Sequence, residues 1–134
     1  MERNKEEMVT LTSADELGTA PTGQADGGRG IITVDKETGA YEFEVDGETA
    51  AGLSYTETGT RVTLLATSVF PEFRGKGIGG EFLGGVLDML RAERRTVTLT
   101  CSFATAFVHS HPEYADVVDP VYPGNATRRH GGVQ

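Results

Sequence analysis

Between Ile31 and Phe70 the chain carries four apolar stretches that are separated by polar turn residues. The first three read IITVD (31–35), AYEFEV (40–45) and TAAGLSYTE (49–57), with KETG and DGE between them. Turn residues of this kind between alternating runs are typical of β-hairpins, so we predict three antiparallel strands. The fourth run, RVTLLATSVF (61–70), predicts a further strand that ends before Pro71, because proline cannot donate a ladder hydrogen bond.

Beyond this strand the apolar residues recur at helical spacing. They fall at i, i+4, i+8, i+9 and i+12, at Ile78, Phe82, Val86, Leu87 and Leu90. This is one face of a helix, which we expect to run to about Arg94. TVTLTC (96–101) predicts a fifth strand, parallel to the fourth because a helix joins the two. FATAFVHS (103–110) predicts a second, shorter helix before HPEYADVV.

Both ends of the chain lack apolar periodicity. Residues 1–29 are rich in Gly, Thr, Asp and Glu, and residues 119–134 carry prolines and glycines. Such segments cannot bury enough apolar surface to order themselves, so we predict flexible tails at both ends. The ordered domain is then residues 30–118, an α+β fold with the element order β-β-β-β-α-β-α.

Composition limits the chain to one domain and narrows the classes of partner. A length of 134 residues with 37% hydrophobic residues allows a single modest core. A formal charge of −8 disfavours nucleic acid and anionic membranes as partners. No apolar run approaches the roughly 20 residues of a membrane span, so we expect a cytoplasmic protein. Cys101 is the only cysteine, which excludes an internal disulfide, and no metal site is predicted.

Glycines and two cations crowd the start of the predicted helix, in FRGKGIGG (73–80). Each glycine inside a helix costs roughly 1 kcal/mol relative to alanine, so the cluster needs a reason. A glycine-rich turn that enters a helix presents bare N–H groups at the positive end of the helix dipole, which suits phosphate. Arg74 and Lys76 would add charge-assisted contacts to the same oxygens. The alternative is close packing of helix on sheet, which for Gly84 and Gly85 explains the residue equally well.

Two phosphate motifs fit this stretch. Gly75, Gly77 and Gly80 satisfy the dinucleotide fingerprint G-x-G-x-x-G, but that motif belongs on the first strand of a repeated βαβ array. Here three hairpin strands precede it. The other reading is R-x-x-G-x-G, with Arg74, Gly77 and Gly79 in register after the fourth strand of a meander.

This second pattern resembles the acetyl-CoA signature of the GNAT superfamily of N-acetyltransferases. With TSV before it, and with CSF and HPEYADVV after it, the chain is similar to the minimal single-domain GNAT family that pairs a strand-end cysteine with an HPEY segment. The resemblance spans residues 31–118. It implies a GNAT-like fold, acetyl-CoA as cosubstrate, and transfer of an acetyl group to a primary amine of a small molecule or peptide.

The resemblance also implies where the cosubstrate binds. The two parallel strands would splay apart, with pantetheine paired to the backbone of the fourth strand and the diphosphate over the glycine turn. The implied binding residues are Thr67, Ser68, Val69, Arg74, Gly75, Lys76, Gly77, Ile78, Gly79 and Gly80. Two departures stand out: relatives often carry histidine where this chain has Ala66, and larger relatives carry a tyrosine general acid where this chain has Phe107.

Three residues are candidates for catalysis: Cys101, His111 and Tyr114. Acyl transfer to an amine needs a deprotonated nucleophile, an oxyanion donor and a proton for the leaving thiolate. Cys101 would accept the acetyl group, protonate the thiolate, or be only a buried thiol. His111 and His109 carry the side chain that suits a general base at neutral pH, or His111 caps the preceding helix. Tyr114 closes the pocket or packs under the sheet edge.

Two other functions compete with acetyl transfer. A non-catalytic acyl-CoA-binding module is favoured by the missing histidine and phenol, and a nucleotide-binding domain by the glycine fingerprint. Polyamine, amino sugar, peptide N-terminus and lysine all remain open as the acceptor. The alternating Glu42, Glu44 and Asp46 mark the solvent side of a strand and receive no chemical role.

Overall fold

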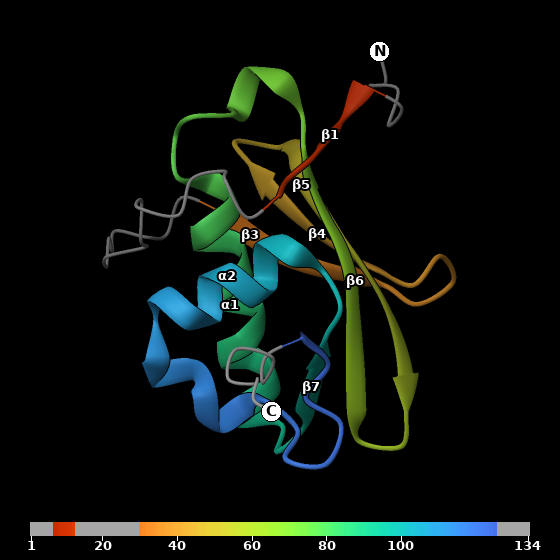
Figure 1. The fold of residues 1–134 in the computed structure, drawn as a ribbon. Coiled ribbons are helices and arrows are strands. Elements are labelled where there is room, and N and C mark those ends of the chain that lie inside the picture. Colours follow the sequence, from red (N-terminus) through yellow and green to blue (C-terminus); the bar gives the residue numbers. More distant parts are fainter. Residues whose placement is uncertain (1–6, 13–29, 126–134) are drawn as a thin grey trace.

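The computed structural model describes residues 7–12 and 30–125, which form one mixed sheet with two helices (Figure 1). The strands are β1 (Val9–Thr10), β3 (Gly30–Asp35), β4 (Ala40–Val45), β5 (Glu48–Thr58), β6 (Arg61–Val69) and β7 (Thr96–Leu99). The helices are α1 (Ile78–Ala92) and α2 (Ser102–Ser110), with 3-10 turns η2 (Pro71–Phe73) and η3 (Pro112–Val117). The predicted α+β element order is therefore confirmed for residues 30–118.

The sheet has the strand order β1-β6-β5-β4-β3, with β7 paired to β6. The hairpins β3–β4, β4–β5 and β5–β6 are antiparallel, as the turn signals predicted. The pair β6–β7 is parallel, because α1 carries the chain from the end of one strand back to the start of the other. β6 therefore borders β5 on one side, and β7 and β1 on the other.

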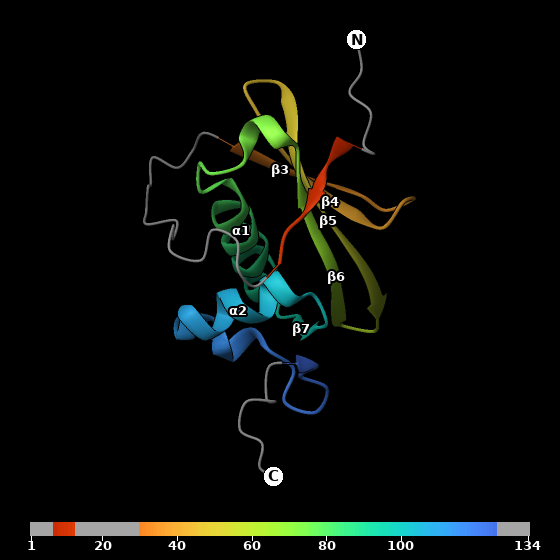
Figure 2. The same cartoon turned by 45° about the horizontal axis from the view of Figure 1, so that its top comes forward.

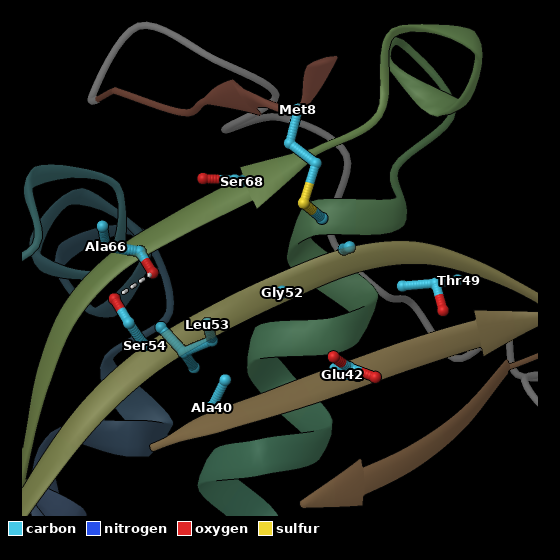
Figure 3. A pocket seen from close by; sticks show the side chains of 10 residues that line it. Met8, Ala40, Glu42, Thr49, Gly52, Leu53, Ser54, Ala66 and Ser68 are labelled. Atoms are coloured by element: carbon cyan, nitrogen blue, oxygen red, sulfur yellow. Dashed lines mark hydrogen bonds between the residues drawn. The ribbon is translucent and has the colours of Figure 1, made fainter. Parts of the chain in front are cut away.

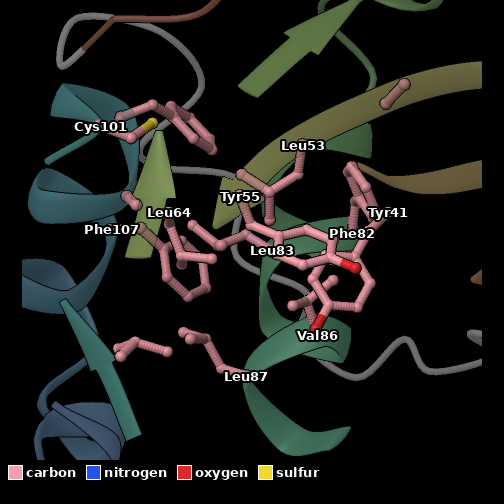
Figure 4. Packing of buried hydrophobic residues seen from close by; sticks show 14 of the residues in the cluster. Tyr41, Leu53, Tyr55, Leu64, Phe82, Leu83, Val86, Leu87, Cys101 and Phe107 are labelled. Carbon is pink, nitrogen blue, oxygen red and sulfur yellow. The ribbon is translucent and has the colours of Figure 1, made fainter. Parts of the chain in front are cut away.

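The apolar face of α1 covers one side of the sheet, and this contact makes the core (Figure 4). The Phe82 ring of α1 stacks on Phe43 of β4 with centroids 5.2 Å apart. A Cβ on Gly85 would lie 2.6 Å from the Ile32 side chain, so this glycine serves close packing. Among the described residues, neither helix is long and apolar enough to cross a membrane.

A bulge in β6 was not predicted. Ser54 of β5 pairs with Ala66, and Tyr55 pairs with Leu64, so Leu65 is an extra residue in the ladder. The bulge changes which residues face the core. Even-numbered Val62 and Leu64 are buried before it, and odd-numbered Thr67 and Val69 are buried after it. An extra residue of this kind bends the strand and re-aims its side chains.

Strand β1 lies within the segment that we expected to be a flexible tail, so that expectation is wrong for Val9 and Thr10. The strand pairs antiparallel with β6, Val9 opposite Val69 and Thr10 opposite Ser68. Leu11 follows with 1% of its surface exposed and belongs to the main core. The rest of the expected tail, residues 1–6 and 13–29, lies outside the described residues. Figures 1 and 2 both show β1 beside the C-terminal half of β6.

The expected C-terminal tail also begins later than residue 119. Val118 and Gly124 form parallel bridges to β7, at Val97 and Leu99. The Asp119 carboxylate accepts hydrogen bonds from the Thr96 hydroxyl at 2.6 Å and from two backbone N–H groups, those of Val121 and Tyr122, at 2.9 Å. Residues 118–124 thus cover the second edge of β7, and residues 126–134 lie outside the described chain.

Candidate functional site

The two parallel strands separate in the middle of the sheet. They pair from Arg61–Thr96 to Leu64–Leu99. One more hydrogen bond, from the Thr100 N–H to the Leu64 carbonyl at 3.2 Å, closes the pairing. Beyond this point β6 runs on to Val69 through its bulge, whereas the chain after Thr100 turns into α2. We call the space between these diverging segments the fork.

Cys101 and Thr67 face each other across the fork. The Cys101 thiol lies 3.4 Å from the Thr67 hydroxyl, within hydrogen-bonding range for sulfur. Both side chains are buried, with 3% and 0% of their surface exposed. The bulge at Leu65 is what turns Thr67 inward to meet the cysteine. Cys101 is also the N-cap residue of α2, and its carbonyl accepts from the Thr105 hydroxyl and N–H at 3.0 Å.

The predicted glycine turn leads from η2 into α1, and we call residues 74–77 the glycine loop. Gly75 and Gly77 both have φ of +76°, a left-handed conformation that side chains other than glycine rarely adopt. Gly77 is the N-cap of α1, so the N–H groups of the first helical turn follow it directly. Arg74 and Lys76 are exposed on the same loop. This combination of N–H groups, positive helix end and cations is suited to an anion.

Gly79 and Gly80 belong to the first turn of α1 and are buried together with Ile78. Their positions therefore differ from that of the glycine loop, which is open to solvent. Ile78 packs into the core with 2% of its surface exposed, so its backbone, and not its side chain, is what a ligand at the loop would meet.

His111 and Tyr114 do not join Cys101. They lie beyond the C-terminal end of α2, whose nine residues place them about 14 Å of helix away from its N-cap. The His111 ring stacks on Phe107 with centroids 4.2 Å apart, and its Nδ1 lies 2.9 Å from the Phe107 carbonyl oxygen. His111 thus caps the helix, the structural alternative for this residue.

Tyr114 is held between α2 and α1. Its ring contacts Phe107 with centroids 5.7 Å apart, and the Arg91 guanidinium lies 5.4 Å from the ring centre. Arg91 also donates to Asp116 at 2.6 Å and to the Glu113 carbonyl at 2.7 Å, which fastens η3 to α1. Burial is the main cause that raises the pKa of Tyr114, so the phenol stays protonated at neutral pH.

A small pocket lies on the face of the sheet turned away from α1 (Figure 3). Its volume is about 140 Å³, and it is lined by Met8, Ala40, Glu42, Thr49, Ala51, Gly52, Leu53, Ser54, Ala66 and Ser68. Of these described lining residues, Glu42 alone is charged. Ala66 and Ser68 flank Thr67 in β6 and, because strand side chains alternate, point to the opposite face from it. The sequence predicted the solvent side of β4. It did not predict the pocket, because the lining consists mostly of small residues and one carboxylate, which form no recognisable motif.

Strand β1 occupies the edge of β6 that we assigned to pantetheine. The Leu11 N–H donates to the Thr67 carbonyl at 2.7 Å, and the Thr10 and Ser68 hydroxyls are 3.4 Å apart. In this structure the edge formed by Thr67, Ser68 and Val69, the expected place of pantetheine, therefore has a partner from the chain itself. Alternation over Val9, Thr10 and Leu11 was the one sequence signal, and it is too short to predict a strand.

Comparison with known proteins finds a family model and a solved structure to which the chain is similar. Residues 40–117 match a family model described as GCN5-related N-acetyl-transferase. A search of curated proteins found no match. The crystal structure of the ribosomal-protein-S18-alanine N-acetyltransferase from Escherichia coli is similar at 20% identity and a TM-score of 0.42. The match covers 55% of this chain and 43% of that one, so this chain spans less than half of the solved protein.

Proposed function

Because the chain belongs to the GCN5-related N-acetyltransferase family, we propose that it transfers the acetyl group of acetyl-CoA to a primary amine. The family match covers residues 40–117, from β4 to the end of η3, and so includes both the fork and the glycine loop. The observation that carries the proposal is the position of these two features. The loop follows the C-terminal end of β6 after the short turn η2, and Thr67, which contacts Cys101, lies further back along β6.

This arrangement suits the two ends of acetyl-CoA. The diphosphate would lie over the glycine loop, where Gly75 and Gly77 leave room for it and Arg74 and Lys76 offset its charge. The thioester would lie in the fork beside Cys101. The pantetheine arm that connects them then follows the edge of β6 past Val69 and Thr67, where its two amides find backbone partners.

Transfer breaks the carbon–sulfur bond of the thioester and forms a carbon–nitrogen bond to the amine. The amine loses a proton and the departing thiolate gains one. Thr67 and Cys101 are the hydroxyl and thiol that the fork offers, so we assign them to hydrogen bonding or protonation of the thiolate. His111 and Tyr114 were expected as catalytic residues, but their place beyond the far end of α2 favours structural roles.

The part of the pocket on the open face that β4, β5 and β6 form, without Met8, is our candidate for the acceptor. It borders Ala66 and Ser68, on the other side of β6 from the residues that face Cys101. An acceptor there would approach the thioester across the strand, at the fork. Glu42 gives the pocket a negative charge, which complements an ammonium group.

A non-catalytic acyl-CoA-binding module is the second candidate. It is favoured by Ala66 and Phe107, which replace the histidine and phenol of relatives, and by the distance of His111 and Tyr114 from the fork. Release of free CoA thiol from acetyl-CoA in the presence of linear polyamines, amino sugars, lysine and peptides separates the two. Amine-dependent release with an acetylated product supports the enzyme, whereas tight binding without release for every amine supports the module.

A further inference from the structure

The edge of β6 next to the fork can hold only one partner strand at a time. In the structure that partner is β1, through the ladder Val9–Val69 and Thr10–Ser68 and the Leu11–Thr67 hydrogen bond of 2.7 Å. A pantetheine arm between the glycine loop and Cys101 needs the same edge. Edge strands accept added strands and extended ligands through the same backbone groups, so the two occupants exclude each other.

The Leu11 side chain also lies where the thioester end of pantetheine is expected. Its side chain is 1% exposed and belongs to the same buried cluster as Cys101 and Phe103. It is held at the level of Thr67, whose hydroxyl contacts the Cys101 thiol. An apolar side chain of this chain is therefore anchored next to the pair that we assign to the thioester.

From these contacts we infer that residues 8–11 form an autoinhibitory segment that must leave the β6 edge before acyl-CoA binds. The inference rests on the proposed function, because it needs pantetheine to follow β6. β1 is only two residues long, and β6 is the strand with which it pairs. A strand this short contributes little stability by itself, so it can detach from β6 without unfolding the domain.

The segment lowers the apparent affinity for acetyl-CoA by the fraction of molecules in which the edge is free. If one molecule in ten is open, the measured dissociation constant is about tenfold weaker than the intrinsic one. Ligands that use only the glycine loop escape this penalty. Adenosine 3′,5′-diphosphate and ADP, which carry phosphates but no pantetheine, should therefore bind equally well whether β1 is docked or not.

A reversible lock tests the segment within one protein. Thr10 and Ser68 lie opposite each other with their hydroxyls 3.4 Å apart, so the double variant Thr10→Cys, Ser68→Cys places two thiols within disulfide reach. We expect the oxidised full-length protein to lose acetyl-CoA binding in calorimetry while keeping ADP binding, and reduction to restore acetyl-CoA binding. Unchanged acetyl-CoA affinity after oxidation, or failure of the two cysteines to cross-link, would overturn the inference.

A second variant releases the segment. Leu11→Asp puts a charge in the buried position and should expel β1, whereas Thr12→Asp adds the same charge at the exposed next residue and serves as control. Leu11→Asp should bind acetyl-CoA several-fold more tightly than wild type or Thr12→Asp, with equal ADP affinity. Equal or weaker acetyl-CoA binding in Leu11→Asp contradicts autoinhibition. If no form of the protein binds acetyl-CoA, both the autoinhibitory role of residues 8–11 and the proposed function are wrong.

Discussion

The Cys101 thiol lies 3.4 Å from the Thr67 hydroxyl, at the point where β6 and β7 part. The two side chains come from different elements, and the contact depends on the β6 bulge, which turns Thr67 inward. Both side chains are buried where the strands part, and Thr67 is the one buried polar residue among the described residues. We therefore treat the pair as the reactive part of the fork and expect its members to act together.

Removal of either member of the pair should slow turnover, and removal of both should add little. Cys101→Ala and Thr67→Val each lose the contact, so the double variant should be far less impaired than the product of the single effects. We expect losses of about 100-fold in kcat for the single variants, the lower end of what a positioned proton donor contributes. Strictly multiplicative losses would show that the two residues act independently.

Acetyl transfer should be direct, without a stable acetyl group on Cys101. The thiol is 3% exposed and contacts the Thr67 hydroxyl, and a hydroxyl is too weak a base to make a thiolate. Intact-mass measurement after incubation with acetyl-CoA and no amine should show no adduct. An acetyl adduct that hydroxylamine removes, and that passes to added amine at the rate of turnover, would instead establish a covalent relay.

Tyr114→Phe should leave acetyl transfer nearly unchanged. The phenol lies beyond the far end of α2, and burial raises its pKa, so it does not ionise near neutral pH. We expect a loss of less than about tenfold in kcat, below the usual contribution of a general acid. His111→Gln should behave alike in turnover while lowering the melting temperature, since the ring stacks on Phe107. A loss of about 100-fold or more for Tyr114→Phe would contradict this prediction and support a catalytic role for Tyr114.

Acid should loosen the segment 118–124. The pKa of Asp119 lies below its ordinary value of 3.8, mainly because its carboxylate accepts a hydrogen bond from the Thr96 hydroxyl. Hydrogen bonds from the Tyr122 and Val121 N–H groups lower this pKa further. Because the folded pKa is lower, this contribution is complete above pH 3.8 and is lost as pH falls through the folded value. Asp119→Asn should flatten the decline of the melting temperature below pH 4, and the exposed Glu37→Gln should not. Identical acid profiles for Asp119→Asn and wild type would contradict this.

Alternation and turn residues in the sequence predicted the meander, and helical spacing from Ile78 to Leu90 predicted α1. These signals are local, because a hairpin or an amphipathic helix is encoded by residues close together in the sequence. The bulge at Leu65 is not local in this sense. It is visible only once β5 sets the register, and RVTLLATSV reads as a regular strand without it.

The candidate site was predicted in part. R-x-x-G-x-G predicted the glycine loop, and the family resemblance implied that the parallel strands part, whereas His111 and Tyr114 were grouped with Cys101 through the HPEY segment of the same resemblance. The intervening α2 carries them away, as only the helix length reveals. Strand β1 escaped prediction because Val9 and Leu11 gain order from the edge of β6, a partner about 60 residues distant.

Calorimetric titration with acetyl-CoA tests the central claim most directly, with Gly77→Glu compared with Gly59→Glu. Both glycines have positive φ, +76° and +62°, so both variants place a side chain in a left-handed conformation and add the same charge. Gly59 lies in the β5–β6 turn, at the other end of β6 from the glycine loop. We predict that wild type and Gly59→Glu bind acetyl-CoA and that Gly77→Glu, folded by its melting curve, does not, because its carboxylate fills the diphosphate position. Equal affinity in Gly77→Glu and Gly59→Glu would contradict the assignment of the glycine loop.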